Sequence, residues 1–183
     1  DEGAAAAIVT TRQMTLKHTA KPVFVAAAQL GSPLYGTTFG TIASGGSSGS
    51  ARMSAPEVSV VTARRAYEQA GLGPDDLSCI ELQDTESASE IIYYEQLGLC
   101  APGEGGKLVD EGATEIHGRL PVNTSGGLIA KGEPVGASSL GQVHELVLQL
   151  RGQAGDRQVA GAKVGLSHTV GAGGNCSVII LKR

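Results

Sequence analysis

The sequence predicts a layered α/β domain with a mixed central sheet of five strands. Three observations lead to this prediction: apolar runs of strand length, helical periodicity between them, and a length of 183 residues, enough to bury one core. Strands that alternate with helices of this size form a sheet covered by helices. The expected order of elements is βαβαβαββ.

The first part of the chain contains two predicted strands. Residues 3–9 are small and apolar, which predicts a strand, and a polar turn follows at residues 10–13. Residues 23–30 predict a second strand, and their uninterrupted apolar character predicts burial on both faces. Residues 31–54 are rich in Gly and Ser, which predicts either a flexible surface loop or a lid over a site.

A helix and a buried strand are predicted next. Apolar residues recur at helical spacing, at Ala63, Ala66, Tyr67 and Ala70. Gly71 follows this run directly and predicts a glycine C-cap. Residues 77–82 then predict a strand.

The middle of the chain predicts a capped helix and a hairpin. Ser87 with Glu90 three residues later predicts a capping box, and the helix that it opens ends at Gly98. Residues 107–121 carry short alternating segments around Glu111 and Gly112, which favours a hairpin excursion.

The last part of the chain predicts one helix and two strands. Apolar residues from 140 to 150 repeat at helical spacing and Gly152 ends that helix. Strands are predicted at residues 159–168 and 177–181, joined by a glycine turn at residues 171–174.

Loops at strand ends are where α/β folds place their sites. The informative loops are therefore those after Leu82, around Gly132 and after Leu166.

Composition and charge exclude several classes of protein. Apolar residues make up 41% of the chain, which excludes a disordered tail, and no apolar run approaches the ~20 residues that span a bilayer. The net charge of −4 is scattered, whereas nucleic-acid binding needs a basic stripe. No signal peptide opens the sequence, and three cysteines without a tight spacing favour a reducing compartment. We therefore expect a cytoplasmic protein.

One long glycine-rich segment is specific enough to identify a family. Residues 123–138 read NTSGGLIAKGEPVGAS, which resembles the thiolase segment N-x-S-G-G-x-x-x-x-G-H-P-x-G-A-T/S. Residues 57–82 look like the thiolase stretch before its second active-site loop, and residues 1–6 resemble the D-G-A-A-A strand that closes the first half of the family. Residues 97–100 and 166–168 resemble the sterol-carrier-protein-2-type and lipid-transfer-protein-like thiolases. The chain is therefore identified as a thiolase-like C-terminal half.

The resemblance implies an architecture and partners. Thiolases have two similar βαβαβαββ halves packed back to back, with an acyl-CoA site between them, and they form dimers or tetramers. Residues 1–20 then correspond to the closing strand and linker of the first half, and residues 21–183 to the C-terminal domain. The nucleophilic cysteine lies in the first half, on the same or a separate chain. A coenzyme A thioester is the expected substrate, with no covalently bound cofactor and no metal.

The resemblance also locates the reactive positions, and each is substituted. Gln83 stands where the family has Asn or His, and Thr85 where it has a possible Cys. Glu133 replaces the histidine of G-H-P, and Thr169 stands at the position of the last-loop cysteine. Ordinary thiolysis is therefore not expected from this half.

The substitution at Glu133 reverses the chemistry of its position. A neutral imidazole donates a hydrogen bond to an oxyanion, whereas an ionised carboxylate only accepts one. Burial would favour the protonated acid, and a helix N-terminus directly after Pro134 would favour the carboxylate. Gln83 and Thr85 can donate, but neither is a strong base.

The candidate residues fall into two groups. The catalytic candidates are Gln83, Asp84, Glu133 and His168. The substrate-binding candidates are Thr85, Ser125, Gly126, Gly127, Gly136 and Thr169. We expect Gln83, Glu133 and His168 to converge on one pocket.

The remaining cysteines and histidines favour structural interpretations. Cys79 lies in a strand and Cys100 after a helix, so both are expected to be structural. Cys176 is either a core residue or a reactive thiol. The other histidines, at positions 18, 117 and 144, show no ligand spacing and are expected at the surface.

Three functions remain open from the sequence. The first is an enzyme of altered mechanism, an acyltransferase or C–C lyase relative that uses Gln83, Asp84 and Glu133. The second is a non-catalytic acyl-CoA- or lipid-binding protein. The third is a structural subunit that completes a site on another chain.

Overall fold

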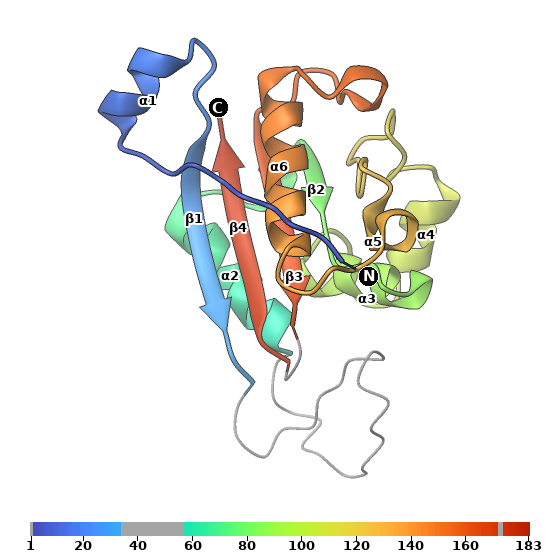
Figure 1. Cartoon of the computed structure of the whole chain (residues 1–183). Coiled ribbons are helices and arrows are strands. Elements are labelled where there is room, and N and C mark those ends of the chain that lie inside the picture. The colour runs from blue at the N-terminus through green and yellow to red at the C-terminus, as the bar shows by residue number, and fades with distance from the viewer. Residues whose placement is uncertain (1, 34–56, 172–173) are drawn as a thin grey trace.

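The chain folds into an α/β domain with a mixed sheet flanked by helices (Figure 1). The computed structural model describes residues 2–33, 57–171 and 174–183. The strands are β1 (Phe24–Gly31), β2 (Cys79–Glu81), β3 (Val164–Val170) and β4 (Cys176–Lys182). Their order is β1-β4-β3-β2, with β2 parallel to β3 and the other two pairs antiparallel. The predicted mixed sheet is confirmed.

A fifth strand does not form in the described part of the chain. Val122 makes one isolated parallel bridge to Ile80, so the segment beside β2 is too short to count as a strand. The five-stranded prediction was wrong on this point.

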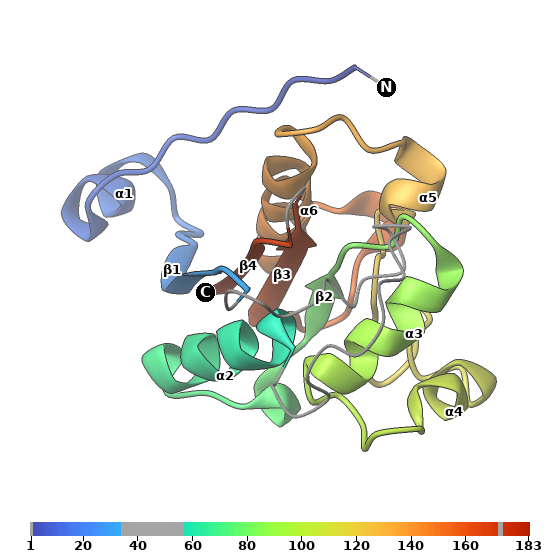
Figure 2. The ribbon, with the colours of Figure 1, turned by 90° about the horizontal axis from the view of Figure 1, so that it is seen from below.

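Helices cover both faces of the sheet (Figure 2). Helix α6 (Ser138–Arg151) lies on one face, and α2 (Val58–Ala70) and α3 (Ser87–Gln96) lie on the other. The shorter elements are α1 (Arg12–His18), α4 (Gly105–Asp110), α5 (Gly127–Lys131) and the 3-10 turns Pro74–Asp76 and Gly155–Arg157.

Each face of the sheet has its own apolar core. The smaller core joins Leu146 and Leu150 of α6 to Leu181 and Cys79. The larger core lies under α2 and α3 and includes Ala63, Ala66, Tyr94, Ile80, Leu166, Val178 and Ile180. Burial of this apolar area is the main favourable contribution to folding.

The two long helices end as predicted, but one predicted cap is absent. Gly71 and Gly152 terminate α2 and α6 in the left-handed conformation, with φ of 64° and 70°. The capping box of Ser87 and Glu90 was wrong, because Glu86 is the N-cap of α3 and makes no side-chain cap bond. Glu90 instead accepts a hydrogen bond from Tyr94 Oη at 2.7 Å.

The N-terminal expectations need correction. Residues 3–9 form no strand and are exposed, because no described strand pairs with them. The polar turn is replaced by the start of α1, where Thr11 Oγ1 accepts from Met14 N at 3.3 Å. Strand β1 is not buried on both faces, since it pairs only with β4 and leaves Val25 and Leu30 56% and 74% exposed.

Two further segments differ from the prediction. Residues 107–121 contain the end of α4 followed by turns, so the expected hairpin is wrong. The strand predicted at residues 159–168 is β3, and it begins at Val164 rather than at residue 159. Most of the Gly/Ser segment at 31–54 lies outside the described residues. Among the described helices, none has the length and apolar character that crossing a membrane requires.

Candidate functional site

The loop after β2 and the loop after α5 meet through Gln83 and Glu133. Strand β2 is fully buried, and the chain continues from it into Gln83, which is 4% exposed. Gln83 Nε2 donates a hydrogen bond to Glu133 Oε1, and Glu133 itself is exposed. Gln83 Oε1 is buried and has no hydrogen-bond partner in the described structure. Two of the three loops predicted to form the site therefore meet here.

Asp84 fixes the two loops to each other. Its Oδ1 accepts a hydrogen bond from Leu128 N at 2.6 Å, across 44 residues of sequence. Gly127 has φ of +65°, and a Cβ atom there would overlap the Asp84 carboxylate, so only glycine allows this approach. Burial raises the pKa of Asp84, while the backbone N–H groups of Leu128 and Ile129 oppose that rise. Asp84 thus holds the start of α5, whose far end leads to Glu133.

Asn123, the first residue of the glycine-rich segment, is hydrogen-bonded to the chain at β2 and just after it. Its N–H donates to Ile80 O at 2.8 Å, and its Oδ1 accepts from Leu82 N at 2.8 Å. Asn123 adopts φ of 50°, a left-handed conformation that Asn tolerates better than most residues. This residue therefore aligns the glycine-rich segment with the strand that carries Gln83.

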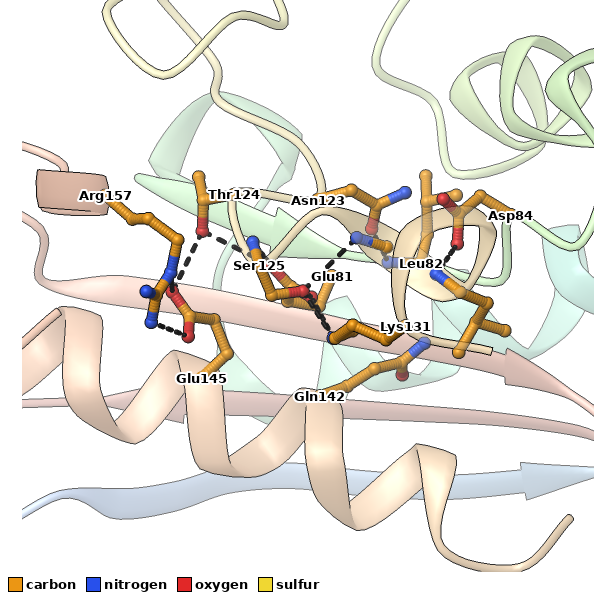
Figure 3. Close-up of polar contacts among 12 residues, drawn as sticks. Glu81, Leu82, Asp84, Asn123, Thr124, Ser125, Lys131, Gln142, Glu145 and Arg157 are labelled. Atoms are coloured by element: carbon orange, nitrogen blue, oxygen red, sulfur yellow. Dashed lines mark hydrogen bonds and ion pairs between the residues drawn. The ribbon is translucent and has the colours of Figure 1, made fainter. Parts of the chain in front are cut away.

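The buried carboxyl group of Glu81 anchors the same segment (Figure 3). Glu81 Oε1 accepts from Ser125 N at 3.1 Å, and Ser125 Oγ donates to Glu81 Oε2. Lys131 Nζ donates to Ser125 Oγ and lies 3.8 Å from Glu81 Oε2. Burial raises the pKa of Glu81, and the bonds from Ser125 and the charge of Lys131 reduce that rise. The predicted substrate-binding hydroxyl of Ser125 is thus engaged within the protein.

A second buried carboxylate extends this polar cluster along α6. Glu145 Oε2 pairs with Arg157 Nη2 at 2.9 Å, and Glu145 Oε1 accepts from Gln149 Nε2 at 3.0 Å. Thr124 Oγ1 lies 3.3 Å from both Glu81 Oε1 and Glu145 Oε1. Burial would raise the pKa of Glu145, but the bonds from Arg157 and Gln149 outweigh it and lower that pKa.

Sequence reasoning missed this cluster, which contains Glu81, Thr124, Glu145, Gln149 and Arg157. A signal was present, because Glu145 and Gln149 lie four residues apart on the side of α6 that also carries Leu146.

His168 is placed differently from the other catalytic candidates. It is fully buried, its Nε2 lies 2.9 Å from Ser59 Oγ, and its ring centroid is 4.5 Å from that of Tyr93. Burial lowers the pKa of His168 to about 3, so the ring is neutral near pH 7. These contacts tie His168 to α2 and α3, whereas Gln83 and Glu133 contact each other.

The remaining predicted binding residues are Thr85, Gly126, Gly136 and Thr169. Thr169 Oγ1 donates to Gln142 Oε1 at 2.9 Å, and Thr85 is half-buried after Asp84. Gly126 and Gly136 have φ of +93° and +84°. The helix expected directly after Pro134 begins later, at Ser138, so its N-terminus lies farther from Glu133 than the sequence suggested.

The cysteines are structural in this fold. Cys176 is completely buried beside Ser59 and Thr62, and burial raises the pKa of its thiol. Burial also raises the pKa of Cys79, to about 12, and that of the half-buried Cys100. The reactive alternative for Cys176 is therefore not supported, since the thiolate is the nucleophile. The predicted surface positions of His18, His117 and His144 are confirmed.

A surface cavity of about 390 Å³ lies elsewhere on the domain. Its lining residues are Glu111, Gly112, Ala113, Glu115, His117, Gly118 and Arg119. None of the candidate site residues belongs to this lining, so the cavity is separate from the Gln83–Glu133 contact.

Comparison with known proteins identifies the family. The thiolase C-terminal domain-like family matches residues 37–183. This chain belongs to that family. It is 44% identical over 183 residues to sterol carrier protein 2 of Bos taurus, covering 99% of this chain and 32% of the relative. It is 41% identical over 183 residues to an acetyl-CoA acetyltransferase of Methanothermobacter thermautotrophicus, covering 100% of this chain and 45% of the relative.

A solved structure shows the same arrangement of elements. An Ltp2-ChsH2(DUF35) aldolase superposes with a TM-score of 0.72 at 28% identity, covering 88% of this chain and 40% of the other. The thiolase-family chain thus spans about a third to under half of the length of these relatives. It is a thiolase-like protein, and the names of its relatives refer to acyl-CoA chemistry and to lipid transfer.

Proposed function

We propose that this chain is the C-terminal half of an acyl-CoA-handling thiolase-family protein whose catalytic residues have been substituted. Its substrate is a coenzyme A thioester, and no covalently bound cofactor takes part. It works beside an N-terminal thiolase half, on the same or a separate chain, in a cytoplasmic oligomer. The reaction is acyl transfer or C–C bond cleavage rather than ordinary thiolysis.

One observation carries the proposal: the hydrogen bond from Gln83 to Glu133. These residues are 50 positions apart. By the resemblance, Gln83 stands where the family has the Asn or His that orders the site, and Glu133 where it has the histidine that donates to the thioester oxygen. The Asp84–Leu128 bond and the Glu81–Ser125 bonds hold both loops in place. A protein that had abandoned the site would have no need to keep its loops in register.

With Glu133 in place of the family's histidine, this position is limited to reactions that use a hydrogen-bond acceptor or a proton acceptor. Glu133 in its ionised form accepts hydrogen bonds and can receive a proton, but it cannot stabilise a thioester oxyanion. Removal of one oxyanion donor typically costs about 10²–10³ in rate. The structural neighbour is named an aldolase, which is consistent with C–C cleavage in this lineage.

A second candidate is a non-catalytic binding or structural subunit. It is favoured by the apolar surface near the N-terminus, where Ile8 and Val9 are 97% and 82% exposed. These two neighbouring apolar side chains are available for contact with another protein surface. The relatives named sterol carrier protein 2 are consistent with lipid binding in this lineage.

Binding and turnover measurements separate the two candidates. Calorimetry would compare a saturated acyl-CoA with free coenzyme A, using the chain in complex with an N-terminal thiolase half. We expect the acyl-CoA to bind and turnover of a suitable thioester to require Glu133. Binding without turnover would favour the second candidate as a binding protein. An absence of acyl-CoA binding would contradict the first candidate and would leave only the structural subunit.

A further inference from the structure

A basic surface lies at the end of the sheet opposite the site loops. Strand β2 leads at its carboxyl end toward Gln83, whereas β3, which is parallel to β2, is preceded at its other end by Lys163. Helix α1, the start of β1 and the ends of β4 and α6 lie at this second end (Figure 1). We call the cations that these segments carry the basic end, and they are Arg12, Lys21, Arg151, Lys163, Lys182 and Arg183.

Three of these cations meet at the carboxyl end of α6. Lys21 Nζ donates to Arg151 O at 2.7 Å, and Arg151 Nε donates to Lys21 O at 3.2 Å. Arg183 Nη1 donates to Leu150 O at 3.2 Å. Cations at this place satisfy the last carbonyls of a helix and interact favourably with its dipole. The bonds go to carbonyl oxygens, so they leave the positive charges without a carboxylate partner.

The other three cations continue the basic end across the sheet. Lys182 pairs in the ladder with the first residue of β1 on one side and the first residue of β3 on the other. The guanidinium of Arg12 lies 4.6 Å from the ring centroid of Phe24, the residue opposite Lys182. Lys163 is joined to the group because its carbonyl accepts from Arg183 N at 3.0 Å. These charges are scattered in the sequence, and the fold gathers them.

Few carboxylates balance the basic end. Each ion pair that the described residues form uses a cation outside it. Residues 10–23 contain no Asp or Glu, and residues 151–164 contain Asp156 alone. On the α2 side, the turn before β2 adds Asp75 and Asp76. Six cations against these three carboxylates leave a net positive charge at this end, although the whole chain carries −4.

Exposed apolar side chains adjoin these cations on α1. Met14 and Leu16 are 46% and 54% exposed, and no residue of α1 is buried. Arg12 on the same helix connects them to the basic end, and Lys17 and His18 add basic groups in the last turn. Proteins that bind at a membrane surface combine Lys and Arg with apolar side chains that enter the headgroup region.

We propose that the basic end docks the protein on an anionic lipid bilayer. The inference goes beyond the proposed function, because it concerns the opposite end of the sheet from the site loops. The cations lie on separate segments, and the cavity of the described structure lies elsewhere, between Glu111 and Arg119. Such a spread of charge fits a surface of many anionic headgroups, and Met14 and Leu16 fit its apolar layer.

Vesicle sedimentation tests the proposal. The chain, with its N-terminal thiolase half, would be mixed with vesicles of pure phosphatidylcholine or of equal parts of phosphatidylcholine and phosphatidylserine. We expect binding to the anionic vesicles and little binding to the neutral ones. Raising the salt concentration should release the protein, because salt screens charges that are exposed to solvent.

Charge variants connect the binding to the basic end. Each cation near an anionic leaflet strengthens binding about fivefold, so Lys163→Gln with Lys182→Gln should weaken it roughly 25-fold. Both side chains are exposed, so the fold is preserved. Arg64→Gln with Arg65→Gln is the matched control, because it removes two charges from exposed positions of α2 outside the basic end. It should change binding by no more than about twofold, since charges far from the bilayer are screened.

A second double variant separates a bilayer from an acidic polypeptide. Met14→Ser with Leu16→Ser should weaken binding to anionic vesicles about tenfold, because two partly exposed side chains lose their apolar contact with the headgroup region. Its salt dependence should match that of the wild-type chain, since no charge is removed. Soluble polyglutamate serves as the competing probe and should bind more weakly than the anionic vesicles.

Three results would overturn the inference. Equal sedimentation with neutral and anionic vesicles would mean that the basic end does not recognise anionic lipid. Equal losses in the two charge variants would mean that net charge alone, and not this surface, drives binding. Binding to polyglutamate without binding to anionic vesicles would assign the basic end to an acidic protein partner. Each of these results leaves the proposed function standing, because acyl-CoA binding is measured separately.

Discussion

Two buried regions of this domain use polar side chains in opposite ways. Around the site loops, carboxyl groups accept hydrogen bonds from the backbone: Asp84 from Leu128 N and Glu81 from Ser125 N. Around His168, a neutral ring packs against Tyr93 with one bond to Ser59. The first region fixes loop geometry through hydrogen bonds to carboxyl groups. The second contributes to stability while His168 is unprotonated.

The largest expected effect is at the contact between Gly127 and Asp84. Gly127→Ala places a Cβ against the carboxylate and forces a side chain into φ of +65°, so it should lower the free energy of unfolding by roughly 2–5 kcal/mol. Gly141→Ala is the matched control, because a Cβ there meets nothing within 4 Å on α6. It should stabilise the domain by about 0.5–1 kcal/mol. Equal effects of the two changes in urea unfolding would contradict the contact.

The second effect concerns pH and His168. The folded pKa of about 3 lies below the ordinary value of 6.5, so the unfolded chain binds more protons between these values. This contribution to stability is complete above pH 6.5 and is lost as the pH falls toward 3. Between pH 7 and 5 it should fall by about 2 kcal/mol.

The variant His168→Gln isolates this contribution, since glutamine does not titrate. The decrease in stability between pH 7 and 5 should be smaller in this variant by about that same 2 kcal/mol. His144→Gln changes an exposed histidine on α6 and should keep the wild-type pH dependence. Identical pH profiles for wild type and His168→Gln would show that the buried ring is not neutral.

A smaller effect is expected when Asp84 is removed. Asp84→Ala leaves the buried N–H of Leu128 without its acceptor and should cost about 1–3 kcal/mol. Asp76→Ala is the control, since Asp76 accepts from Gly73 N at 2.8 Å at an exposed turn where water can replace it. The double variant Asp84→Ala with Gly127→Ala should lose less than the sum of the two. Additive losses would mean that the two residues are not in contact.

The smallest effect is expected from restoring a family residue. Glu133→His returns a donor but no nucleophile, so the 183-residue chain alone should still cleave acetoacetyl-CoA no faster than the uncatalysed reaction. A coenzyme-A-dependent spectrophotometric assay checks this. Robust cleavage by either form would mean that a residue of this chain acts as nucleophile.

The sequence predicted the fold more completely than the site. Helical spacing and glycine caps located α2 and α6, because those signals are local. Residues 3–9 and 107–121 were misassigned, since an apolar or alternating run does not state whether a partner strand exists. Pairing depends on contacts far apart in sequence.

The motif predicted that the loops of Gln83 and Glu133 lie together, and it did not predict the contacts of the other candidate residues. The loops of Gln83 and Glu133 do meet, but Asp84 contacts backbone and His168 packs against other helices. Residue identity gives the possible donors and acceptors of a side chain, whereas its actual partner depends on where the backbone places it. The cluster around Glu145 was missed for the same reason, although the spacing of Glu145 and Gln149 on α6 was a signal for part of it.

The most direct test of the account is where an acyl-CoA binds. Titration of the isotopically labelled chain, with its N-terminal thiolase half, would follow the amide resonances by NMR. The account predicts shifts at the side-chain amide of Gln83 and at the backbone amides of Gly126, Gly127 and Glu133. Shifts confined to the separate cavity between Glu111 and Arg119 would contradict it, because the ligand would then bind away from the Gln83–Glu133 pair.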